Sequence, residues 1–220
     1  MNLNSYSFAS DLDDFMPKLA SLPVEWDGKA CVLELKEADY NWKQMEWWAF
    51  YFEFKVLQKL KNICSIPGDR IERVEFDMKT QINWDIKAKA IKSDDHKVIL
   101  NDTIAMQESI SNHGFHGEII GLCDVEYNDR NRSFQRWHTE LKGGLSQYEI
   151  KRMAGPSTFS RYRKTSAVLS EIIYILFDEN DLEKLNQMNQ GRNSNDKPRP
   201  PKYMLDLEHI DDFQHEKQEI

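Results

Sequence analysis

The sequence has 220 residues, of which 40% are hydrophobic and 30% charged, and its formal net charge is −8. This length suits one well-packed domain and is too short for two substantial ones. No apolar run approaches the length of a membrane span and no secretory signal is visible, so we expect a cytoplasmic protein. The three cysteines, Cys31, Cys64 and Cys123, match no zinc-ligand spacing, which predicts reduced core residues rather than disulfides.

Up to residue 63 the sequence predicts two helices and a strand. The first helix is expected from Asp11 to Leu22, with Ser10 as a possible cap and Pro23 beyond its end. A short strand is expected around Ala30–Leu35. Residues 41–63 carry large apolar side chains around much of a helical circumference, which indicates a mostly buried helix.

Two glutamates of this second helix, Glu46 and Glu53, are seven residues apart and therefore share one face. A salt bridge is the expected role of Glu53. Glu46 falls in the first turn, where the helix dipole favours an acid. The dipole is a sufficient structural reason for Glu46, and a catalytic role stays open beside it.

Residues 71–91, IERVEFDMKTQINWDIKAKAI, have the alternating pattern of a β-hairpin with one apolar and one charged face. In the second arm the core-facing residues are Ile82, Trp84, Ile86, Ala88 and Ala90, and the opposite face carries Asn83, Asp85, Lys87 and Lys89. If the chain reverses at residues 80–81, Asp77 lies beside Asp85, because residues opposed in a ladder project to the same side.

Two carboxylates opposed on a sheet repel each other, so a purely structural sheet tends to avoid this pair unless a cation lies between them. Mg²⁺ prefers oxygen ligands, and a neighbouring lysine can orient or deprotonate an attacking water. The pattern therefore predicts a metal centre in which Asp77 and Asp85 bind the ion beside Lys87. A solvent-facing sheet of mixed charge is the alternative explanation of the same pattern.

Three further elements are expected after the hairpin. They are a strand at Lys97–Leu100, a helix at Thr103–Asn112 capped by Asn101 or Asp102, and a buried central strand at Gly117–Tyr127. From residue 41 the predicted order is helix, strand, strand, strand, helix, strand.

Basic residues gather between residues 129 and 164, where nine basic against three acidic residues give a local net charge of +6. Phe134 and Trp137 lie among them, a composition that suits contact with phosphates and bases, although an ordinary solvated helix fits it as well. The candidate DNA contacts here are Arg130, Arg132, Arg136, Lys142, Arg161, Arg163 and Lys164.

Residues 186–202, NQMNQGRNSNDKPRPPK, have no apolar periodicity and predict a flexible loop that orders on DNA. Arg192 and Arg199 are further candidate DNA contacts there. A last strand is expected at Tyr203–Leu207, followed by a frayed acidic tail.

With acids and a lysine on a hairpin inside this order of elements, residues 41–127 resemble the PD-(D/E)xK nucleases, type II restriction endonucleases in particular. Residues 83–88, 125–129 and 134–144 are also similar to restriction-enzyme sequences. The resemblance implies an α/β fold with a central mixed β-sheet flanked by helices. It makes Asp77 the first acid, Asp85 the second, Lys87 the lysine, and Glu46 the acid of the preceding helix.

Two features depart from the family's pattern: no proline precedes Asp77, and seven residues between Asp77 and Asp85 make a tight hairpin. A second register therefore stays open, in which Asp85 is the first acid and Asp95-His96-Lys97 supplies the acid-x-lysine. We rank it lower because Asp95 falls in a predicted turn.

The resemblance further implies one nuclease domain, divided into an N-terminal extension (1–40), a catalytic core (41–127), a DNA-contacting and C-terminal part (128–210) and an acidic tail (211–220). Its activity would be Mg²⁺-dependent cleavage of double-stranded DNA at a short specific sequence by a homodimer. The alternatives are a structure-selective repair or recombination nuclease of the same fold, and a DNA-binding module without catalysis.

Overall fold

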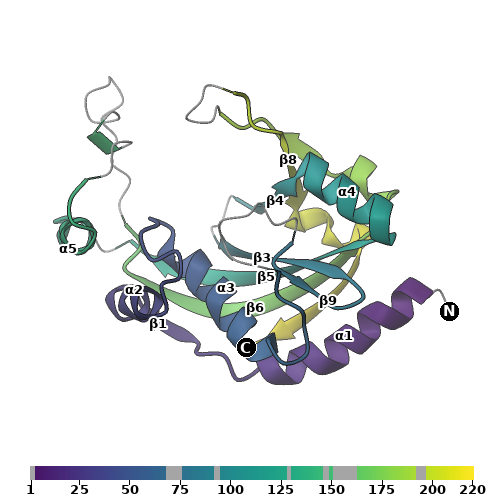
Figure 1. Ribbon diagram of the computed structural model, residues 1–220, viewed down its shortest axis with the longest axis horizontal. Helices are drawn as coiled ribbons and strands as arrows, with labels where there is room; N and C mark the ends of the chain where they lie inside the picture. The colour runs from purple at the N-terminus through teal and green to yellow at the C-terminus, as the bar shows by residue number, and fades with distance from the viewer. Residues whose placement is uncertain are drawn as a thin grey trace.

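A computed structural model describes residues 3–67, 76–91, 95–127, 130–145, 149–150, 163–191 and 197–220. It is a mixed α/β structure in which helices pack on a curled six-stranded sheet, with a smaller three-stranded sheet beside it (Figure 1). None of the helices in these ranges is long and apolar enough to cross a membrane. The three cysteines are buried and free, as predicted.

The main sheet has the order β1-β6-β5-β3-β2, and β9 also pairs with β6. Its strands are β1 (Glu25–Asp27), β2 (Met78–Lys79), β3 (Asn83–Ala90), β5 (His116–Glu126), β6 (Ser166–Phe177) and β9 (Gln214–Glu219). Only the β3–β5 pair is parallel among these described strands. The β3–β5 connection runs through β4 (Lys97–Asp102) and α4 (Thr103–His113).

The second sheet contains β4, β8 (Lys202–Asp206) and β7 (Asn186–Met188), in the order β4-β8-β7. Together with α4 it packs on one face of the main sheet, where Ile120 and Ile173 meet Leu100, Met106 and Leu205. Strand β3 is therefore covered on the side of its charged residues, and the alternative of a solvent-facing sheet is wrong: Asp85 is only 3% exposed.

The other face of the main sheet packs against α1 (Leu3–Leu19), α2 (Gly28–Glu37) and α3 (Trp47–Leu60). Trp84 of β3 lies at the centre of this layer, with ring centroids 6.0 Å from Phe8 and 5.5 Å from Phe15. The predicted core-facing residues of the second hairpin arm lie in or against this core, as expected. Helix α5 (Ser133–Leu141) packs through Phe134 beside Trp47.

The elements between residues 97 and 127 form where the sequence predicts them. Asp102 caps α4 by accepting a hydrogen bond from the backbone N–H of Ala105 (2.9 Å), and Gly114 ends the helix with φ 85°. The predicted order from α3 to β5 is confirmed. The third strand of that order, β4, joins the second sheet rather than the sheet of β2 and β3.

Two predictions in the first forty residues are wrong. Helix α1 begins at Leu3 and runs through Ser10, because Phe8, Leu12 and Phe15 continue one buried stripe. The strand expected at residues 30–35 is helix α2. Asp27 caps it by accepting from the N–H of Ala30 (2.9 Å), and its apolar residues bury at helical spacing.

Three elements later in the chain also differ from the prediction. Helix α3 begins at Trp47 rather than near residue 41. The loop expected at residues 186–202 contains β7, and the acidic tail is not frayed, because β9 pairs with residues 171–176 of β6. Tyr174 Oη donates a hydrogen bond to Gln218 Oε1 (2.6 Å), which fixes β9 to the sheet.

Gly117 of β5, the register partner of Trp84 on β3, leaves room for the large indole of Trp84. A Cβ on Gly117 would lie 2.4 Å from Trp84 Cε3. We expect Gly117→Ala to lower the free energy of unfolding by about 1–3 kcal/mol, because the rigid indole has to move in a packed core. Urea unfolding measures this. Gly191→Ala is the matched control, since no atom of the described residues lies within 4 Å of its Cβ position, and an equal loss in both variants would contradict the packing argument.

Candidate metal centre

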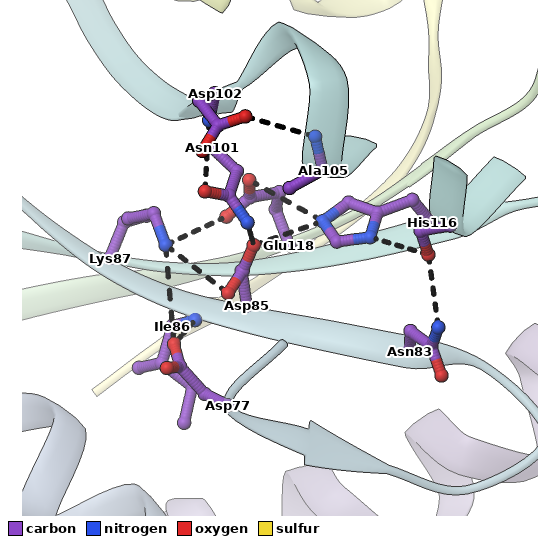
Figure 2. Close-up of polar contacts among 11 residues, drawn as sticks. Asp77, Asn83, Asp85, Ile86, Lys87, Asn101, Asp102, Ala105, His116 and Glu118 are labelled. Atoms are coloured by element: carbon purple, nitrogen blue, oxygen red, sulfur yellow. Dashed lines mark hydrogen bonds and ion pairs between the residues drawn. The ribbon is translucent and has the colours of Figure 1, made fainter. Parts of the chain in front are cut away.

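Charged side chains gather on the face of β3 and β5 that turns toward β4 and α4 (Figure 2). Asp85 and Lys87 are two residues apart on β3 and so share this face. The parallel register places Glu118 beside Asp85 and His116 beside Asn83. The N–H of Asp77 donates to the carbonyl of Trp84 (2.9 Å), which brings Asp77 opposite Asp85 as the sequence predicts. We call Asp77, Asp85, Lys87, His116 and Glu118 the polar cluster.

Lys87 lies at the centre of the polar cluster. Its Nζ is 3.6 Å from Asp85 Oδ1, 4.0 Å from Asp77 Oδ2 and 4.0 Å from Glu118 Oε2. The side chains of Lys87 and Asp77 are 23% and 22% exposed, whereas that of Glu118 is 0% exposed. The cluster is therefore open to solvent at Asp77 and Lys87 and closed at Glu118.

Hydrogen-bond donors and an imidazole hold the two aspartates in place. The amide of Asn101 donates to Asp85 Oδ2, and the N–H of Ile86 donates to Asp77 Oδ2 (2.7 Å). The imidazole Nε2 of His116 lies 3.2 Å from Asp85 Oδ2. These contacts fix the carboxylates before any ligand arrives.

The electrostatics of the cluster separate its two aspartates. Burial alone would raise the pKa of Asp85, but the charge of Lys87 and the bonds from His116 and Asn101 lower it to about 2. Burial and the neighbouring charge of Asp85 raise the pKa of Asp77 well above its usual value. Asp85 is thus ionised at neutral pH, while ionised Asp77 is disfavoured unless more positive charge is near.

For the two basic groups, burial would lower the pKa, and the neighbouring acids raise it. Burial would lower the pKa of Lys87, but Asp85, Glu118 and Asp77 raise it, so the side chain is an ammonium at neutral pH. Burial would likewise lower the pKa of His116, and the neighbouring acids Asp85 and Glu118 raise it to about 9. Both cations are held by the acids around them.

The donor set of the cluster fits a divalent cation. Three carboxylates face one another around the ammonium of Lys87, and both oxygens of buried Glu118 accept no hydrogen bond from the described part of the chain. Within the described ranges, ligand atoms of Asp85, His116 and Glu118 also lie within 4.8 Å of one another. Hard oxygen ligands of this kind suit Mg²⁺.

Helix α3 brings Glu53, rather than Glu46, toward the cluster. The charge of Glu53 acts on both Asp77 and Lys87, and Glu53 and Asp77 line one cavity of about 470 Å³. Glu46 instead contacts Trp48 Nε1 (2.9 Å) and the ammonium of Lys164. An acid inside the aromatic run FYFEFK was the available sequence signal for Glu53, since acids are rarely placed among core residues without a partner.

The second register receives no support from the geometry. Asp95 pairs with Lys89 (2.7 Å), and its side chain is 51% exposed. Of the two acids considered for this role, Asp77 rather than Asp95 lies with Asp85 and Lys87.

Four of the candidate DNA contacts are exposed, and three others form ion pairs with described acids. Arg130, Arg132, Arg136 and Arg199 are exposed. Lys142 and Arg163 pair with Glu149 at 3.6 and 3.7 Å, and Lys164 pairs with Glu46. Arg161 and Arg192 lie outside the described residues.

Sequence reasoning missed His116, Glu118 and Asn101. Glu118 had a usable signal, because an acid at the start of the apolar run GEIIGLC is costly inside a buried parallel strand unless it has a role. Lys202 of β8 was also missed. Burial and the nearby charge of Lys87 lower the pKa of Lys202, and the charges of Glu118 and Asp85 oppose this shift.

No protein-family model, curated protein or solved structure matches this chain. The chemistry of the polar cluster is therefore the basis for a functional proposal.

Proposed function

We propose that the protein is a divalent-metal-dependent nuclease of the PD-(D/E)xK type that hydrolyses phosphodiester bonds of double-stranded DNA. One observation carries the proposal: Asp77 and Asp85 from the two arms of a hairpin meet around Lys87, which follows Asp85 by two residues. Helix α3, which precedes the hairpin, adds Glu53 nearby. The family resemblance implies the two aspartates and the lysine, and it implies an acid on the preceding helix, although at Glu46 rather than Glu53.

In this proposal Asp77 and Asp85 hold Mg²⁺, which when bound neutralises charge on the scissile phosphate. Asp85 is already ionised, with a pKa of about 2. A cation beside Asp77 opposes the burial and repulsion that raise the pKa of Asp77. Both acids are then available as carboxylate ligands at neutral pH.

The raised pKa of Lys87 favours one of the two roles considered for it. An ammonium donates hydrogen bonds and has no lone pair with which to take a proton. Lys87 therefore orients the attacking water or a phosphate oxygen, and stabilises negative charge that develops on the phosphate.

A DNA phosphate would approach the cluster at its exposed end. Asp77 and Lys87 are the members that reach solvent, and the cavity beside Asp77 and Glu53 opens next to them. The exposed arginines Arg130, Arg132 and Arg136 on and before α5 are the candidate contacts to the phosphate backbone. The acidic net charge of the whole chain makes such a local basic surface necessary for DNA binding.

We further propose that cleavage occurs at a short specific sequence and that the protein acts as a homodimer, since a two-fold symmetric enzyme suits a palindromic site. Digestion of long duplex DNA in Mg²⁺ tests this, and the expected result is a set of discrete fragments. Cleavage of branched DNA with linear duplex left intact would favour the structure-selective repair or recombination nuclease. DNA binding with no cleavage of either substrate would leave only the non-catalytic DNA-binding module.

A further inference from the structure

We infer that Asp85, His116 and Glu118 form a second cation site, which takes a transition-metal dication such as Mn²⁺, Co²⁺ or Zn²⁺. Asp85 would be shared with the Mg²⁺ centre proposed above. The inference concerns metal binding and does not require that the protein cleaves DNA.

Glu118 is the first reason for a cation at this position. Its side chain is 0% exposed, and neither carboxylate oxygen accepts a hydrogen bond from any residue that the structure describes. The nearest cationic nitrogens are Lys87 Nζ at 4.0 Å and His116 Nε2 at 3.8 Å, both beyond hydrogen-bond distance. A buried carboxylate in this state is stabilised strongly by a directly bound cation.

The second reason is the orientation of His116. Its Nδ1 lies 3.1 Å from Ser109 Oγ, which also accepts a hydrogen bond from the amide of Asn83 (3.1 Å). A proton on Nδ1 can therefore be donated to Ser109. A metal ion that displaces the proton from Nε2 would then be bound by the Nε2 lone pair, on the side where Asp85 and Glu118 lie. Metal-binding histidines are commonly oriented in this way, by a hydrogen bond from the other ring nitrogen.

The spacing of the three ligands fits one ion. Neighbouring ligands at about 2.1 Å from a metal lie roughly 3.0–3.4 Å apart. His116 Nε2 is 3.2 Å from Asp85 Oδ2 and 3.8 Å from Glu118 Oε1. Small rotations of buried side chains close the remaining difference.

The mixed donor set decides the class of metal. One imidazole nitrogen and two carboxylates favour Mn²⁺, Co²⁺ or Zn²⁺ over Mg²⁺, which prefers all-oxygen sites. Because His116 and Glu118 are fully buried, an ion here does not reach a DNA phosphate. Such an ion would fix the position of the Asp85 carboxylate, which also belongs to the proposed Mg²⁺ centre at the exposed end of the cluster.

Titration of the whole protein with Co²⁺ alone, followed by visible absorption, tests the site. We expect Co²⁺ to produce a d–d absorption band, and His116→Gln to weaken the binding at least about tenfold. His113→Gln is the matched control, because His113 is exposed near the end of α4. Asp77→Asn should leave the band in place. Equal bands in the wild type and in His116→Gln would overturn the inference.

A second measurement serves if His116→Gln fails to fold. An anomalous-difference map of a wild-type crystal grown with Mn²⁺ should show a peak bonded to His116 Nε2 and to a Glu118 oxygen. A map with no peak at Nε2 contradicts the second site. Absence of DNA cleavage, with the His116-dependent band retained, contradicts the proposed function and leaves this site intact.

Discussion

Asp85→Asn is expected to lower the rate of Mg²⁺-dependent DNA cleavage at least about a hundredfold, which corresponds to about 2.7 kcal/mol of transition-state stabilisation. Asparagine keeps the size of the side chain and removes the charge that binds the cation. The rate is measured on duplex DNA with protein in excess, so that chemistry rather than product release is followed. Circular dichroism checks that the variant is folded.

Asp95→Asn is the matched control for Asp85→Asn, because Asp95 belongs to the second register and pairs with Lys89. It should cleave at nearly the wild-type rate. Full activity of Asp85→Asn would remove the polar cluster from the reaction. Loss of activity in Asp95→Asn alone would favour the second register.

Lys87→Ala is the second large effect, with an expected loss of about 10²–10³ in the cleavage rate. The ammonium lies 3.6 Å from Asp85 and is the only described cation within 4.0 Å of Asp77, Asp85 and Glu118 together. Its removal takes away the group that orients water, and it also leaves buried acids with less positive charge. The same single-turnover assay measures the loss of rate.

Lys89→Ala controls for the loss of a cation from the same face of β3, because Lys89 pairs with Asp95 instead. We expect its cleavage rate to stay within a few fold of wild type. Similar losses in the two lysine variants would mean that general electrostatic attraction for DNA, rather than a specific role of Lys87, is being measured.

The sequence predicts those residues of the site that lie on the tight hairpin. Asp77, Asp85 and Lys87 come from two neighbouring arms, so their proximity follows from period-2 alternation and one reversal of the chain. Helix α4 was similarly predictable, because Asp102 and Gly114 mark its ends locally. The family assignment itself stays a prediction.

The rest of the site depends on a long-range register. Glu118 and His116 reach Asp85 only because β3 and β5 pair in parallel after a crossover through β4 and α4. No local pattern specifies that register. Glu46 was preferred because it was expected inside the first turn of the helix. Helix α3 begins only at Trp47, and Glu53, further along the helix, is the glutamate that lines a cavity with Asp77.

Two errors in the fold have tertiary causes as well. The sequence of β9, QHEKQE, has no apolar alternation and becomes a strand because the edge of β6 offers it hydrogen bonds. Residues 30–35 contain a short apolar run that fits a strand or a helix equally well. The cap from Asp27 and burial against α3 decide for the helix.

The most direct test of the central claim is the metal requirement of the unmodified protein. Long duplex DNA, which contains any short recognition sequence many times, is incubated with the protein in Mg²⁺ and in EDTA, and the fragments are followed with time. The proposal predicts cleavage in Mg²⁺, none in EDTA, and recovery when excess Mg²⁺ is restored. Cleavage that continues undiminished in EDTA, or DNA that stays intact in Mg²⁺, would contradict a metal-dependent nuclease centre at Asp77, Asp85 and Lys87.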